Sequence, residues 1–180
     1  MKKPDVLYHA SPNRNIEIFK PRNESVRDAN EGPVVFATSQ KDYASCFLVV
    51  TDDNWVQISR FNNVRVVVIS DRSRFAREDQ GGAIYELPSD TFVNEIRGSA
   101  KDEWTSREAM KPIGKEVFES GLAAMLNYGV QVYFVDKTTF KKITNADDHG
   151  ISILRTLQSE NQKLKINIKK LPWWNFDEKE

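Results

Sequence analysis

Histidine is the side chain best suited to proton chemistry near neutral pH, because its charge changes close to that pH. The chain has two. His9 ends a predicted strand directly before a turn, so it faces the loop side where binding residues are common; a structural histidine is the alternative. His149 lies in a polar junction between predicted helices, which indicates a solvated or capping role. The two lack the spacing of metal ligands and no third ligand accompanies them, so no metal site is predicted.

Glu103 is the candidate catalytic carboxylate. It opens a predicted strand after a loop and precedes Trp104. A carboxylate beside an indole is partly desolvated, which suits it to electrostatic or acid–base work. The alternative is that Asp102 and Glu103 form an exposed acidic pair. Glu86 is the rival carboxylate, but it points to the opposite strand face from Tyr85, which favours a solvated position.

Cys46 is the single cysteine of the chain, so an internal disulfide and a cysteine-based zinc site are excluded. It lies inside an apolar helical stretch, where cysteine usually behaves as a small core residue. A thiol–imidazole pair with His9 is therefore disfavoured. Gly81 and Gly82 form a turn without the continuation of a phosphate-binding loop, and no Gly-x-Ser-x-Gly elbow occurs.

Short strands and helices must position these residues. Alternating or β-branched runs predict strands over residues 5–9, 33–38, 55–59, 64–69, 83–87, 103–106 and 130–135. Ser39 offers an N-cap to a helix that carries Tyr43, and a short helical turn surrounds Phe75. Residues 109–113 are predicted as an edge strand because of Pro112.

A helix with an apolar stripe follows, formed by Val117, Leu122, Met125 and Leu126, and Gly129 stands at its C-cap position. Residues 137–160 are predicted as two helical pieces broken near 145–148. The pattern indicates an α+β fold, with about seven short strands in a split, antiparallel-rich sheet and peripheral helices. We predict one domain over residues 1–160 and a C-terminal extension, 161–180, with a strand and then a Trp-rich tail.

Composition narrows the function classes. The 180 residues include 26 Lys+Arg and 26 Asp+Glu, and 39% are hydrophobic. Zero net charge argues against non-specific nucleic-acid binding, which depends on phosphate neutralisation. The longest apolar run is far shorter than the ~20 residues of a membrane span, and the first residues contain no secretory signal. We therefore expect a cytoplasmic protein without a membrane partner.

Three segments, in this order, resemble the motifs of the ADP-ribosyltransferase fold of the diphtheria-toxin and poly(ADP-ribose) polymerase type. Residues 7–11 (LYHAS) look like the aromatic-His-Gly-Ser/Thr of its first strand. Residues 32–38 (GPVVFAT), followed by Tyr43, look like its Gly-x-Tyr-Phe-Ala strand and the helix after it. Residues 101–106 (KDEWTS) look like the Glu-aromatic strand opening. Alanine replaces the family glycine, and the stacking tyrosine aligns with Val35 or Phe36.

The resemblance implies that NAD is the substrate and that the motif residues line one cleft. His9 would bind the adenosine ribose of NAD, and Ala10, followed by Ser11, would grip the nicotinamide carboxamide. Phe36 or Tyr43 would stack on the nicotinamide ring. Glu103 would bind the 2′-hydroxyl of the nicotinamide ribose and stabilise positive charge at its anomeric carbon. The pyrophosphate would pair with an arginine of the first loop: Arg14, Arg22 or Arg27.

Three functions are compatible with these residues. The first is an NAD-dependent ADP-ribosyltransferase acting on a protein or nucleic-acid acceptor. The second is a non-catalytic NAD- or ADP-ribose-binding or protein-interaction module on the same fold, which the missing tyrosine favours. The third is a relative of the NAD-dependent RNA 2′-phosphotransferases; it ranks last because clustered basic residues for phosphorylated RNA are lacking.

Overall fold

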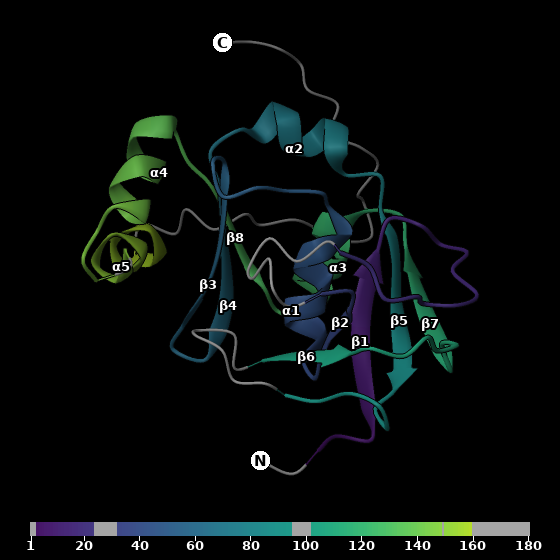
Figure 1. Cartoon of the computed structure of the whole chain (residues 1–180). Helices are drawn as coiled ribbons and strands as arrows, with labels where there is room; N and C mark the ends of the chain where they lie inside the picture. The colour runs from purple at the N-terminus through teal and green to yellow at the C-terminus, as the bar shows by residue number, and fades with distance from the viewer. Residues whose placement is uncertain (1–2, 24–31, 95–101, 149, 160–180) are drawn as a thin grey trace.

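The computed structural model describes residues 3–23, 32–94, 102–148 and 150–159. This part of the chain is a mixed α+β structure with two β-sheets and five α-helices (Figure 1). The predicted α+β class is confirmed. His149, Arg27 and the C-terminal extension lie outside the described residues. None of the described helices combines the length and the apolarity required to cross a bilayer.

The larger sheet carries the motif residues. Its strand order is β6-β2-β1-β5-β7, and every neighbouring pair is antiparallel. The strands are β1 (Val6–Ser11), β2 (Val35–Thr38), β5 (Gly82–Pro88), β6 (Glu103–Ser106) and β7 (Gly114–Phe118). The segments that resemble the first, second and third motif therefore form three adjacent strands, with the second in the middle.

The smaller sheet has the order β3-β4-β8. Strands β3 (Val56–Phe61) and β4 (Val64–Ile69) form a hairpin, and β8 (Gln131–Phe134) pairs with β4 in parallel. The hairpin turn uses Asn62 and Asn63 at φ 49° and 61°. Asparagine tolerates this left-handed conformation better than most residues, which makes a tight two-residue turn possible here.

Helices fill the space between the sheets and cover the smaller one (Figure 1). Helix α1 (Lys41–Ser45), a 3₁₀ turn (Cys46–Leu48) and α3 (Gly121–Asn127) pack on both sheets. Thus Ala44 and Ala124 share a hydrophobic cluster with Ile84 of the larger sheet, while Leu122 and Met125 lie in the core of the smaller one. Helices α4 (Lys137–Thr144) and α5 (Ile151–Ser159) pack on its other face, and α2 (Arg72–Glu78) follows β4.

The region from residue 109 to 128 differs from the prediction. Residues 109–113 are not a strand, although Met110 forms an isolated bridge with Phe19. The edge strand is β7, and Val117, predicted on the helix stripe, belongs to it. The helix begins only at Gly121, because the Ser120 side chain caps it by accepting a hydrogen bond from the Ala123 backbone. The described residues form eight strands, against about seven predicted.

Candidate functional site

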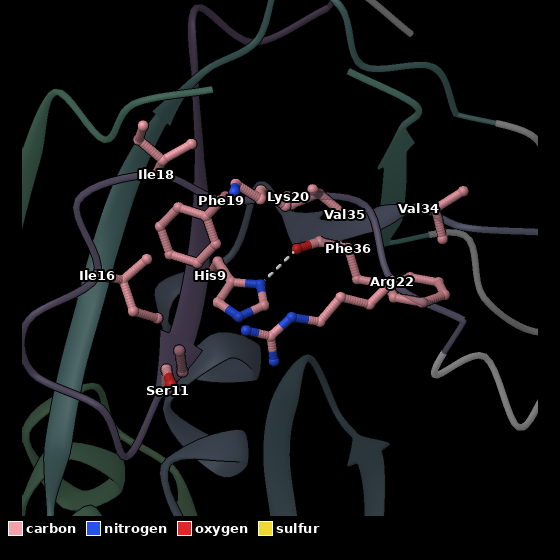
Figure 2. A pocket seen from close by; sticks show the side chains of 11 residues that line it. His9, Ser11, Ile16, Ile18, Phe19, Lys20, Arg22, Val34, Val35 and Phe36 are labelled. Carbon is pink, nitrogen blue, oxygen red and sulfur yellow. Dashed lines mark hydrogen bonds between the residues drawn. The ribbon is translucent and has the colours of Figure 1, made fainter. Parts of the chain in front are cut away.

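A pocket opens where β1 and β2 separate. The two strands pair only at Tyr8 and Thr38, whereas β1 stays paired with β5 as far as Ser11. Beyond that single pair lies a hollow of about 300 Å³ (Figure 2). It is lined by the end of β1 (His9, Ala10, Ser11), by the following segment (Ile16, Ile18, Phe19, Lys20, Arg22) and by Val34, Val35 and Phe36. Its volume is at the lower end of the range for small-molecule sites, roughly 300–1,000 Å³.

The His9 ring is held in a fixed orientation at the wall of this pocket. Its Nδ1 lies 2.6 Å from the Phe36 carbonyl oxygen (Figure 2). Because a carbonyl oxygen only accepts, Nδ1 carries the proton and donates it. The ring also meets Phe19 edge-on, with 4.8 Å between ring centroids. The imidazole thus contacts β2 beyond the Tyr8–Thr38 pair, where no backbone pairing joins β1 and β2, and it lies in the gap between these strands.

Two cations line the pocket on a tethered segment. Phe19 exchanges backbone hydrogen bonds with Met110, and Arg22 exchanges them with Val34, which fixes the chain on either side of Lys20. In Figure 2 the Arg22 side chain points toward the His9 ring. No described residue of the lining is acidic. A positive pocket with apolar walls suits an anionic ligand that also carries an apolar ring.

Of the arginines predicted to bind the pyrophosphate, Arg22 lines the pocket and Arg14 does not. The Arg14 guanidinium donates to the carbonyl oxygens of Gln80 and Phe118 and pairs with Glu119 at 3.5 Å. Arg14 therefore ties the first loop to the β5–β7 side of the sheet.

Tyr43 and Glu103 form a second group outside the pocket. The Tyr43 hydroxyl donates to Oε1 of Glu103 across 3.0 Å. Burial, and then the nearby carboxylate, raise the pKa of Tyr43, so the hydroxyl remains a donor at neutral pH. Tyr8 pairs with Thr38, and Thr38 with Glu103, which puts these three on one face of the sheet and His9 on the other. The expected single cleft is therefore divided between the two faces.

Phe36 connects the two groups. It lines the pocket, and it pairs with Thr105 two residues along β6 from Glu103. Side chains in this diagonal relation share a sheet face and lie roughly 7–8 Å apart. Phe36 therefore lies both at the wall of the pocket and on the sheet face that carries Glu103.

Arg65, which was not predicted from the sequence as a site residue, lies beside Tyr43 and Asp102. It is buried on β4, and its guanidinium lies 4.3 Å from the centre of the Tyr43 ring. It also pairs with Asp102 at 3.2 Å, directly before Glu103. The available signal was the single charge inside the β-branched run 64–69, because a cation in a buried strand needs partners.

Cys46 lies outside the pocket lining, and we predict that its thiol is unreactive in the folded protein. It is 3% exposed, and burial raises the pKa of the thiol to about 12. The reactive thiolate is therefore nearly absent at pH 8. Iodoacetamide labelling followed by mass spectrometry should find native Cys46 unmodified after an hour and fully modified in 6 M guanidinium. Rapid labelling of the native protein would contradict this burial.

The described residues contain no group of three or more His, Cys, Asp or Glu side chains placed to hold a metal ion. Comparisons of the chain with models of protein families, with curated proteins and with solved structures find no match. The site therefore has to be interpreted from its own geometry.

Proposed function

We propose that this protein binds NAD in the pocket between β1 and β2 and transfers its ADP-ribose to a protein or nucleic-acid acceptor. The observation that carries the proposal is the lining of the pocket. His9, Ala10, Ser11, Arg22 and Phe36, five residues expected to bind NAD, come together there from separate segments. The three motif strands also lie side by side in one sheet, which supports a site that draws on all three.

The chemistry of the pocket matches the parts of NAD. Lys20 and Arg22 provide charge for the pyrophosphate, and Arg22 can bind it through two N–H groups. Phe36 offers a flat apolar surface for a ring. A hollow of about 300 Å³ holds only part of a dinucleotide, so the other part extends past Phe36 toward Glu103.

Glu103 would act when the bond between nicotinamide and its ribose breaks. The bonding electrons leave with nicotinamide, and the anomeric carbon becomes positively charged. A fixed carboxylate stabilises that charge until an acceptor oxygen, nitrogen or sulfur forms the new bond and releases its proton. Tyr43, donating to Oε1, holds the carboxylate in place.

NAD should raise the melting temperature of the protein, since a ligand that binds only the folded state stabilises it. We expect a measurable shift at 1 mM NAD in differential scanning fluorimetry.

Arg22→Ala should weaken the NAD affinity measured by calorimetry about tenfold or more, because a charged hydrogen bond to phosphate is lost. Arg14→Ala, which removes an arginine of the same loop outside the pocket, is the matched control and should leave the affinity unchanged. The absence of any shift at millimolar NAD would overturn the proposal.

A second function, a non-catalytic NAD- or ADP-ribose-binding module, is favoured by one observation. Glu103 lies on the opposite sheet face from His9 and is hydrogen-bonded to Tyr43. Chromatographic detection of nicotinamide separates the two functions. Binding of NAD without release of nicotinamide, in the presence of cell-extract acceptors, would favour the binding module.

A further inference from the structure

Arg65 is a buried cation that belongs to one sheet and contacts residues beside a carboxylate of the other. It lies on β4 with 6% of its surface exposed, and the following β4 residues, Val66–Ile69, are all buried. Burying a charge costs free energy unless it is paired. The partners of Arg65 therefore indicate why this position is not apolar like its neighbours.

Those partners lie at or just before the starts of β6 and α1. Nη2 of Arg65 lies 3.2 Å from Oδ2 of Asp102, the residue before Glu103, and 3.2 Å from Oε1 of Gln40. Nε is 3.7 Å from the Asp42 carboxylate, too long for a hydrogen bond but close enough for an ion pair. One guanidinium thus joins the start of β6 to the start of α1.

The same guanidinium covers the ring of Tyr43. Its central carbon lies 4.3 Å from the ring centroid, within the range of a cation–π interaction. The hydroxyl of that ring donates to Glu103 Oε1 across 3.0 Å. Arg65 therefore reaches the Glu103 carboxylate through the Tyr43 ring, and its pair with Asp102 anchors the guanidinium beside β6.

We propose that Arg65 is a positioning residue that fixes the Glu103 carboxylate for catalysis. The inference rests on the proposed function, because it assigns Arg65 a role in the step that Glu103 serves. A planar guanidinium stacks on a ring while its edge binds oxygens, whereas a lysine ammonium provides one point charge. A small misplacement of a catalytic group can reduce the rate about 100-fold.

The test is a double-mutant cycle in steady-state NAD turnover, with Arg65→Met, Tyr43→Phe and the double variant. We expect Arg65→Met to lower kcat between about 10- and 100-fold and to leave KM for NAD within about twofold, because the NAD-binding pocket is built by other residues. If Arg65 acts through Tyr43, the loss of kcat in the double variant is no greater than the loss in the less active of the two single variants.

Arg60→Met is the matched control. Arg60 pairs with the same Asp102 at 3.7 Å from an exposed position, so kcat should stay within about twofold of wild type.

Near-UV circular dichroism establishes that each variant is folded at the assay temperature. If Arg65→Met fails to fold, Arg65→Lys replaces it; lysine keeps the charge, and kcat should still fall about tenfold. Three results would overturn this inference: an unchanged kcat in Arg65→Met, a rise in its KM for NAD as large as its loss of kcat, or losses of kcat that multiply in the double variant. In each case, turnover of NAD by the wild-type protein leaves the proposed function standing. A wild-type protein that does not consume NAD overturns both.

Discussion

Replacing Glu103 with glutamine is expected to lower ADP-ribose transfer about 100- to 1,000-fold, the usual effect of removing one group that stabilises transition-state charge. Glutamine has the size of glutamate, and its amide oxygen still accepts the hydrogen bond that Tyr43 donates. The substitution therefore removes the negative charge and little else. The NAD affinity should stay within about twofold of wild type, because charge on the anomeric carbon develops only as the bond to nicotinamide breaks.

The measurement is the initial rate of nicotinamide release, together with NAD affinity by calorimetry. Glu86→Gln is the matched control. Glu86 pairs with Tyr8 across β1 and β5, so it shares the sheet face of Glu103, but its carboxylate forms an ion pair with Lys41 at 3.5 Å. Its replacement should leave the rate unchanged. Equal losses in the two variants, or full activity of Glu103→Gln, would remove Glu103 from the mechanism.

Five of the residues that line the pocket could be proposed from the sequence because they lie in, or in the loop after, short segments that resemble family motifs. His9 was predicted at the end of a strand before a turn, although β1 continues to Ser11, and Phe36 lies in a buried-type strand that precedes a helix. Arg65 could not be assigned in this way. Its hydrogen-bond partners Gln40 and Asp102 lie 25 and 37 residues away in sequence, and only the packing of the two sheets brings them together.

The sheet face of Glu103 was equally inaccessible to local reasoning. Successive strand residues point to opposite faces, so a shift of one position in the pairing of β2 with its neighbours moves a side chain across the sheet. The error at 114–118 has a related cause. Val117 fits a helical stripe, but it is 47% exposed on an edge strand, and pairing with β5 decides its conformation.

The largest loss of stability is expected from Asp79, which the sequence did not single out. Asp79 is 9% exposed, and its carboxylate accepts four hydrogen bonds from described residues. The donors are the backbone N–H groups of Gly81, Gly121 and Leu122 and the Ser120 hydroxyl. One side chain thus joins the turn before β5 to the first turn of α3, a helix that packs between the two sheets.

Asp79→Ala should reduce the free energy of unfolding by about 3 kcal/mol or more, since several buried donors lose their acceptor at once. Glycine at 121 makes the arrangement possible, because a Cβ there would lie 2.6 Å from the Val49 side chain. Asp79→Asn, which keeps one acceptor oxygen, should lose less than the alanine variant. Asp71→Ala is the control: Asp71 caps α2 with a single bond to the Arg74 backbone, and its loss should cost about 1 kcal/mol. Urea unfolding followed by circular dichroism gives the three values. Equal losses in the free energy of unfolding for Asp79→Ala and Asp71→Ala would contradict this prediction. They would mean that the Asp79 carboxylate contributes no more than an ordinary helix cap and does not fix α3 between the two sheets.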